Sequence, residues 1–403
     1  MRRIDPSLLV ILGGVSAALH VGKLAPALPA LQQALGLSLL EAGFMLSLVQ
    51  LAGMTLGLAV GLAADALGLR RTMLAGLLLL SAASLAGGWA RDAGSLLLLR
   101  AAEGFGFLLA SMPAPSLIRR LVAPQQLQVQ LGLWGAYMPV GTALALLAGP
   151  PAIAFLGWPG WWWLLASLSL GMALWIAIAV PPDGRATSRA SASPAWKQRL
   201  RSTLSSRGPW LVAGAFAMYS GQWLAVIGFL PSIYAQAGWA GAAAGAATAL
   251  AAAVNIAGNV GAGRLLQRGV LPQRLLYAGF GTMAAGALVA FAPVGDFAGA
   301  GAVALQYAAV LLFSMLGGLI PGTLFALAVR LAPGPETVST TVGWMQQLSS
   351  VGQFFGPPLV AWVATQAGGW QWSGLVTAAC ALAGGVFAVM LGEALRRLPA
   401  AGP

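Results

Sequence analysis

Twelve stretches of mostly apolar residues, each about as long as a helix that crosses a bilayer, run through the whole chain. A crossing needs roughly 20 such residues. We place the stretches at about residues 8–30, 42–63, 73–90, 94–117, 129–150, 160–181, 209–235, 241–263, 274–293, 300–329, 338–364 and 372–392. Only 7% of the 403 residues are charged, too few to hydrate the surface of a soluble domain. The chain is therefore predicted to be an all-α membrane protein of twelve transmembrane helices.

The basic residues are concentrated on one side of the predicted helices. Of the 21 Lys and Arg, 18 fall in the even-numbered loops or at the termini, whereas Arg91 falls on the opposite side and Lys23 and Arg100 lie within helices. Because cytoplasmic loops carry an excess of Lys and Arg, both termini are predicted to be cytoplasmic, in the inner or plasma membrane. The formal charge of +12 reflects this topology. It is spread over short separate loops, so a nucleic-acid partner is not expected.

Two sequence patterns recur at half the chain length. The pattern Gly-Pro-Pro followed by Gly-Trp occurs at 149–158 and again at 356–370, and a glycine-rich basic turn occurs at 61–71 and again at 261–269. We predict an N-terminal bundle (1–181), a basic polar linker loop (182–208) and a C-terminal bundle (209–403). Copies in the same orientation predict six helices in each bundle, pseudo-two-fold symmetry and a central cavity.

The turn after the second predicted helix contains Gly61, Asp65, Gly68, Arg70 and Arg71. These residues fit the pattern Gly-x-Leu-Ala-Asp-x-x-Gly-x-Arg-Lys/Arg, so the turn resembles the loop between helices two and three of the major facilitator superfamily. The resemblance implies that the five residues form a cytoplasmic gating latch, in which the Asp caps a neighbouring helix and the basic residues pair across the seam. Alternatively, they form a charged turn that only fixes the topology.

The fifth predicted helix, with the segment from Gly132 to Thr142, resembles the cyanate and nitroimidazole transporter-like branch of that family. The pattern of drug:proton antiporters is only partly present on this helix. Gly141 and Gly149-Pro150 fit it, but Pro151 and the two residues after it replace the expected paired glycines. This departure makes a multidrug exporter the less favoured reading.

Four titratable residues lie within the predicted first and fourth helices: His20, Lys23, Arg100 and Glu103. A charge at mid-bilayer costs ~2.5–3.5 kcal/mol on insertion scales, so such residues normally face protein or a wet cavity. Each pair is spaced by three residues and shares one helix face. We expect His20, Lys23 and Arg100 to bind an anionic substrate, and Glu103 or His20 to carry a coupling proton.

A structural alternative exists for the same four residues. Glu103 would then neutralise Arg100 on its own helix, and His20 or Lys23 would cap a carbonyl group freed near Pro26.

The remaining polar candidates are Tyr137, Gln222, Asn255 and Gln346. We expect them to contact the substrate, since a phenol or an amide orients a ligand without a strong charge. Amides also bridge helices, which is the alternative for each of the last three. Trp158 and the three tryptophans at 161–163 are interpreted as anchors at the membrane interface.

These features predict a secondary active transporter of a small solute, a small organic anion in the favoured reading, that works by proton-coupled alternating access. The alternatives are a drug or metabolite:proton antiporter acting as an exporter and a transporter-like receptor without flux. The chain has one His and one Cys and lacks nucleophile, zinc and nucleotide-binding motifs, so we expect no enzyme, cofactor or metal. The expected partners are the substrate, protons and the lipid bilayer, and the expected state is a monomer.

Overall fold

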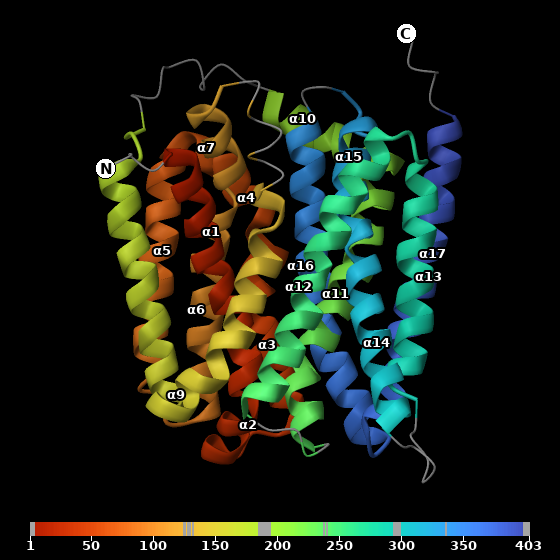
Figure 1. Cartoon of the computed structure of the whole chain (residues 1–403). Coiled ribbons are helices and arrows are strands. Elements are labelled where there is room, and N and C mark those ends of the chain that lie inside the picture. Colours follow the sequence, from red (N-terminus) through yellow and green to blue (C-terminus); the bar gives the residue numbers. More distant parts are fainter. Residues whose placement is uncertain are drawn as a thin grey trace. The chain divides into compact units, whose positions relative to one another are not determined.

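The computed structural model is helical throughout the part of the chain that it describes (Figure 1). That part comprises residues 5–123, 126, 130, 133–183, 195–236, 238, 241–292, 300–334 and 337–397, without the side chains of 61–66, 195, 196, 241, 242, 300 and 339. The chain divides into two compact units: unit 1 is Met1–Ser193 with Ala225–Ala253, and unit 2 is Pro194–Leu224 with Val254–Pro403.

Unit 1 contains the helices of the N-terminal part of the chain. They are α1 (Pro6–Gly22), α2 (Leu24–Leu35), α3 (Leu39–Ser47), the short 3-10 helix η1 (Leu48–Gln50), α4 (Leu51–Leu67), α5 (Leu69–Gly87), α6 (Ala93–Ser111), α7 (Ala114–Leu121) and α9 (Tyr137–Ala179). Helix α1 packs mainly against α9, and α5 packs against both α6 and α9. Unit 1 also takes in the second part of α11 and the first part of α12.

Unit 2 contains most of the remaining helices. They are α10 (Ala195–Ser205), α11 (Arg207–Gln236), α12 (Gly241–Gln267), α13 (Pro272–Ala290), α14 (Ala300–Gly317), α15 (Leu319–Arg330), α16 (Val338–Gln366), the 3-10 helix η4 (Trp370–Trp372) and α17 (Ser373–Arg396). Helix α13 packs against α14, α15 and α17. The predicted linker differs from the expected polar loop, because α10 forms within it.

Nine helical segments in the described residues are long and apolar enough to cross a bilayer. Three differences explain why the structure has nine such segments and the sequence has twelve apolar stretches. Helix α9 is one continuous element where two were expected, and α13 and α16 are not among the nine. The latter two are the more polar: α13 has Gln273 and Arg274 in its first turn, and α16 contains three glutamines before its last residue.

The 43-residue helix α9 is interrupted at Gly157. This residue has φ 69° and ψ 170°, a conformation outside the helical region that glycine adopts without a steric penalty. The chain reverses its direction within α9, so the two parts of this helix run in opposite directions (Figure 1). A break of one residue thus stands where the sequence predicted a loop of several residues.

The turn between α1 and α2 positions Lys23 inside unit 1. Pro26 has no amide hydrogen, so the carbonyl group of Gly22 loses its helical partner and the helix is interrupted here. The amide of Lys23 still donates to the carbonyl of Leu19 (2.7 Å). At the other end of α1, the Asp5 carboxylate caps the helix by accepting from the amide of Ser7 (2.8 Å).

Candidate functional site

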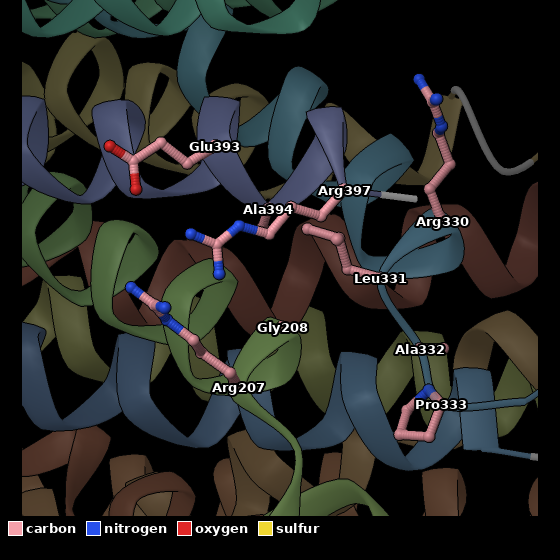
Figure 2. Close-up of a pocket in the computed structure, with 9 residues that line it drawn as sticks. All are labelled: Arg207, Gly208, Arg330, Leu331, Ala332, Pro333, Glu393, Ala394 and Arg397. Carbon is pink, nitrogen blue, oxygen red and sulfur yellow. The ribbon is translucent and has the colours of Figure 1, made fainter. Parts of the chain in front are cut away.

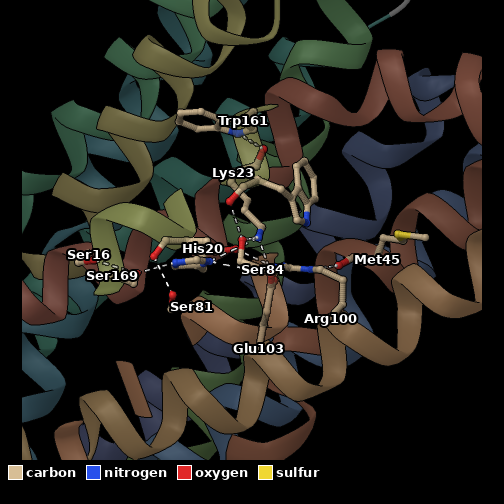
Figure 3. A network of polar contacts seen from close by, with 12 residues as sticks. Ser16, His20, Lys23, Met45, Ser81, Ser84, Arg100, Glu103, Trp161 and Ser169 are labelled. Atoms are coloured by element: carbon tan, nitrogen blue, oxygen red, sulfur yellow. Dashed lines mark hydrogen bonds and ion pairs between the residues drawn. The ribbon is translucent and has the colours of Figure 1, made fainter. Parts of the chain in front are cut away.

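Four titratable side chains meet in the interior of unit 1 (Figure 3). They are His20 on α1, Lys23 at the turn between α1 and α2, and Arg100 and Glu103 on α6. None is more than 1% exposed. We call these four residues the charged cluster; their assignment to substrate and proton binding stays a prediction.

The Glu103 carboxylate is at the centre of the charged cluster. Its Oε1 forms an ion pair with the ammonium of Lys23, and its Oε2 is paired with Nη1 of Arg100 at 2.5 Å. The structural alternative raised by the sequence, a pair between Glu103 and Arg100 on one helix, is thus present. Arg100 is not the sole partner of this carboxylate, because Lys23, at the turn between α1 and α2, also pairs with it.

The Arg100 guanidinium also holds two backbone carbonyl groups. Its Nε donates to the carbonyl of Met45 on α3 (3.2 Å), and its Nη1 donates to that of His20 (2.8 Å). Its Nη2 is buried and has no hydrogen-bond partner among the described residues. A buried donor without a partner costs about 1–3 kcal/mol, so this atom is a point where a bound acceptor would add stability.

The Lys23 ammonium has an acceptor for each of its three hydrogens. Besides Glu103, it donates to Oγ of Ser84 on α5 (2.8 Å) and lies 3.4 Å from Nδ1 of His20. Its Nζ also lies 4.5 Å from the centre of the Trp162 ring, within the range of a cation–π contact. This environment fits the charged form of the side chain.

Helix α9 encloses the charged cluster through three side chains that the sequence did not reveal as parts of a site. Oγ of Ser169 lies 2.8 Å from Nε2 of His20, and Nε1 of Trp161 donates to the carbonyl of Lys23 (3.1 Å). The interpretation of the tryptophans as interfacial anchors is wrong for Trp161 and Trp162, which are 1% and 0% exposed. Trp161 and Trp162 belong to no recognisable sequence motif, so only the fold reveals that both contact Lys23.

The charged cluster has an excess of positive charge. With His20 neutral, the charges of Lys23, Arg100 and Glu103 leave a net charge of +1 in a site shielded from solvent. Nε1 of Trp162 is a second buried donor without a partner in the described part of the chain. The excess charge and the unused donor on Arg100 both favour binding of an anion.

A second feature of unit 1 is a carboxylate clamp at the beginning of α5. The Asp183 carboxylate accepts from the amides of Arg70 (3.1 Å) and Arg71 (3.0 Å) and from Nη1 of Arg120 on α7 (2.7 Å). The guanidinium of Arg70 additionally donates to the carbonyl of Ala177 near the end of α9. The clamp therefore ties α5, α7 and the segment after α9 together.

Gly68 makes room for this clamp. It has φ 96°, which favours glycine, and a Cβ at this position would lie 2.5 Å from Oδ2 of Asp183. Burial raises the pKa of Asp183, but the amides of Arg71 and Arg70 and the Arg120 guanidinium outweigh burial and bring the pKa below its ordinary value.

The resemblance implied that Asp65 caps a neighbouring helix, whereas Asp183 caps α5. The side chain of Asp65 lies outside the described part, although the backbone of Gly61 and Asp65 continues α4. Asp183 was missed because it follows two prolines at the end of an apolar stretch and belongs to no pattern of the turn itself.

Unit 2 contains an uncharged hydrogen-bond network around Asn255 on α12. Nδ2 of Asn255 donates to the carbonyl of Ser314 (2.7 Å) and to the hydroxyl of Tyr219 (3.0 Å). Its Oδ1 accepts from Nδ2 of Asn259 (2.9 Å), and Nε1 of Trp223 donates to Oγ of Ser314 (3.0 Å). Asn255 therefore joins α11, α12 and α14, the bridging role that was its alternative.

The other predicted contact residues are in different settings. Gln222 on α11 is buried; its Nε2 donates to the carbonyl of Met218 (2.9 Å), and its Oε1 has no partner among the described residues. Gln346 is half-buried on α16. In unit 1, the Tyr137 ring stacks on Trp134 at 4.1 Å, and its hydroxyl is hydrogen-bonded to the side chain of Ser111.

A pocket of about 350 Å³ lies at one end of unit 2. It is lined by the ends of α11, α15 and α17, with Arg207, Arg330, Glu393 and Arg397 among the lining residues. Arg207 and Arg397 extend toward the same side of the pocket, whereas Arg330 extends away from them (Figure 2). All four charged side chains are exposed, so this pocket differs from the enclosed charged cluster.

Residues 10–357 match the family model described as Major Facilitator Superfamily. Puromycin resistance protein pur8 of Streptomyces alboniger is 35% identical over 185 residues, which is 45% of this chain and 35% of that protein. Solute carrier family 2, facilitated glucose transporter member 10 of Homo sapiens is 34% identical over 146 residues, 35% of this chain and 27% of that protein. The chain thus spans about a third or less of the length of these relatives.

Two solved structures share the fold. A bacterial homologue of the human lysosomal transporter Spinster, in an inward-facing and occupied conformation, has a TM-score of 0.79 at 15% identity over 98% of each chain. A D-xylose–proton symporter has a TM-score of 0.71 at 18% identity over 96% of each chain. The family match covers most of the chain, and the helices are those of a multi-pass membrane protein. The chain belongs to the Major Facilitator Superfamily.

Proposed function

We propose that this protein is a membrane transporter that carries a small organic anion by proton-coupled alternating access. The observation that supports the proposal is the net charge of +1 in the charged cluster, together with the unused buried donor on Arg100. An uncompensated charge in a membrane interior is costly, and so is an unpaired buried donor; an anionic group that accepts from Nη2 of Arg100 would remove both penalties. Lys23, Arg100 and His20 are the proposed anion contacts, and the charged cluster is the proposed proton-coupling centre.

The topology that goes with this proposal has twelve spans in two six-helix bundles around a central cavity, with residues 182–208 as the linker. Counting the two parts of α9 separately and adding α13 and α16 to the nine apolar segments brings the number to twelve. Both termini are proposed to be cytoplasmic, in the inner or plasma membrane, because the loop cations gather on that side.

Four further residues complete the proposed substrate site: Tyr137, Gln222, Asn255 and Gln346. Gln222 has the best support, because its buried Oε1 lacks a donor and a substrate hydroxyl or protonated carboxyl would supply one. For Asn255, substrate contact competes with the bridging bonds described above.

Gly61, Asp65, Gly68, Arg70 and Arg71 are the proposed gating residues. The contacts of Arg70 and Arg71 with Asp183 support a latch at this turn. We also place the chain near the cyanate and nitroimidazole transporter-like branch, on the pattern of the fifth predicted helix alone.

The test is uptake into proteoliposomes. Purified protein is first screened by thermal shift against small carboxylates and cyanate, since a ligand stabilises the state that it binds. Hits are then used as labelled substrates with an imposed pH gradient. We expect Arg100→Gln and Lys23→Gln each to weaken binding more than ~10-fold, or ~1.4 kcal/mol, whereas the matched Arg91→Gln, outside the charged cluster, binds normally. Full affinity in both cluster variants contradicts an anionic substrate, and binding without flux would identify a receptor.

A second candidate function is proton-driven export of a drug or metabolite, which the similarity to puromycin resistance protein pur8 favours. Cells expressing the chain would then grow at higher puromycin concentrations than vector controls. The Arg100→Gln variant separates a transport effect from an expression effect if both proteins reach the membrane in equal amounts.

The proposed topology has a test of its own. A cysteine introduced at Ser191 in a Cys380→Ala background should react with a membrane-impermeant maleimide only after the cells are opened. Labelling from outside intact cells would place the linker on the wrong side.

A further inference from the structure

We propose that Lys23 is the proton carrier of the charged cluster, and that the ammonium form is the form that binds the anion while the amine form belongs to the empty site. Neither Glu103 nor His20 then changes charge. The inference rests on the proposed function for its link to anion transport, but the change of charge at Lys23 stands independently of any substrate.

The choice of Lys23 follows from counting charges. With Lys23 and Arg100 protonated, Glu103 ionised and His20 neutral, the buried net charge is +1. Protonating Glu103 or His20 would raise it to +2, and guanidinium does not lose its proton in proteins. Loss of a proton from Lys23 is the one change at these four groups that brings the net charge to zero.

Among the described residues, no further charged group contacts Lys23, so the net charge of the charged cluster is set by its four members. Helix α6 contributes Glu103 and Arg100, and α1 contributes His20. From α5 and α9, the contacts of Lys23 among the described residues are with uncharged groups, Ser84 and Trp162.

Glu103 is poorly suited to carry the proton because both of its oxygens are occupied. A proton on Oε1 would displace the Lys23 ammonium, and one on Oε2 would displace Arg100. Either change breaks a buried ion pair and leaves a cation without its partner, which is strongly unfavourable.

Lys23, in contrast, can lose a proton with its hydrogen bonds retained. The hydroxyl of Ser84 now accepts from Nζ and donates to the carbonyl of Trp162 (3.0 Å). In the amine form, Nζ keeps two N–H groups for Glu103 and His20 and has a lone pair. The Ser84 hydroxyl can rotate and donate to that lone pair. The step is Lys23–NH3+ giving Lys23–NH2 and one proton, which passes to water when the site opens.

This assignment predicts one proton for each univalent anion. Anion binding brings one negative charge, which favours the ammonium form, and release of the anion favours release of the proton. The charged cluster and its ligand then carry zero net charge in both the loaded and the empty state, which lowers the cost of moving the site through a closed conformation.

The chain offers a direct test because it contains only two lysines, Lys23 and Lys197. Protein labelled with 15N-lysine at the side chain, in nanodiscs without added anions other than buffer, gives two Nζ signals, and Lys197→Arg assigns them. Lys197 is exposed on α10 and serves as the internal control. We expect the Lys23 signal to move from the ammonium to the amine region between about pH 5 and about pH 9, while Lys197 stays an ammonium.

Variants separate Lys23 from the other carriers. His20→Gln should leave the Lys23 transition in place, and Glu103→Gln should hold Lys23 in the amine form over the whole range. If Glu103→Gln fails to fold, Glu103→Asp keeps the charge, and the transition should persist in it. A Lys23 signal that remains ammonium up to about pH 9 in the wild type overturns the inference, as does a transition that disappears in His20→Gln.

Failure of this inference is distinguishable from failure of the proposed function. A titrating Lys23 without anion uptake in proteoliposomes rejects the anion transporter and keeps the proton site. Anion uptake with a Lys23 that never titrates rejects Lys23 as the carrier and keeps the transporter.

Discussion

Replacing Asp183 with alanine should release α5 from α7 and from the segment after α9. Three contributions add up. Loss of a side-chain cap costs about 1 kcal/mol. Loss of a negative charge beside the beginning of α5 costs about 0.3–1 kcal/mol. The pair with Arg120, whose side chain is 36% exposed, adds no more than about 0.5 kcal/mol because solvent screens it. The expected total is about 2 kcal/mol.

Thermal unfolding in detergent, followed by tryptophan fluorescence, measures this loss. For a chain of 403 residues, about 2 kcal/mol corresponds to a decrease in Tm of about 2 °C. Asp92→Ala is the matched control, because Asp92 caps α6 through the amide of its neighbour Ser95 (2.8 Å) and contacts no other helix in the described structure. Its substitution should cost only about 1 kcal/mol.

The same contacts predict a pH dependence. The pKa of Asp183 is lower in the folded protein than its ordinary value of 3.8. The carboxylate therefore contributes its full stabilisation above pH 3.8, and this contribution is lost as the pH falls through the folded pKa. The difference in Tm between the wild type and Asp183→Asn should be largest at neutral pH and shrink at acid pH. An effect of Asp183→Ala no larger than that of Asp92→Ala, or one independent of pH, would refute the clamp.

Three further substitutions test other contacts. Gly68→Ala should cost at least about 1 kcal/mol, because φ is positive there and the added Cβ meets Asp183; thermal unfolding measures it. Trp161→Phe should cost about 1 kcal/mol through loss of the bond to the carbonyl of Lys23, measured in the same way. Asn255→Ala should cost about 2–3 kcal/mol, because two of its hydrogen bonds hold α12 to α11 and α14; limited proteolysis of unit 2 follows the loss.

Each of these substitutions has a control in the same kind of helix. Gly171→Ala on α9 meets no atom within 4 Å and should be neutral or slightly stabilising. Trp163→Phe removes an exposed bond to the carbonyl of Leu85, and Asn259→Ala removes bonds only to Asn255 among the described contacts. Equal effects of a variant and its control would contradict the corresponding account.

The sequence predicted the helical membrane fold and the family because both follow from local patterns. These are the length of the apolar stretches, the spacing of the basic loops and one glycine-rich turn. It also identified the four titratable residues, since a charge inside an apolar stretch stands out. It did not reveal Ser84, Ser169 or Trp162, because serine and tryptophan in apolar helices are common and only packing brings them to the charged cluster. Asp183 was missed for the same reason, since its partner amides lie more than a hundred residues away.

The magnitudes indicate which contacts of unit 1 would open during the proposed transport cycle. The contacts of the clamp together contribute about 2 kcal/mol to stability, a free energy that ligand or proton binding readily supplies. Separating the helices that share Glu103 would leave buried charges unpaired at a cost of about 3–5 kcal/mol for each broken pair. Helix α5 and the second part of α9 contribute to both sites, Ser84 and Ser169 to the charged cluster and Arg70 and Ala177 to the clamp. We therefore expect these two helices to move as one body with the charged cluster intact, and the contact of Asp183 with Arg120 on α7 to be the one that breaks and re-forms.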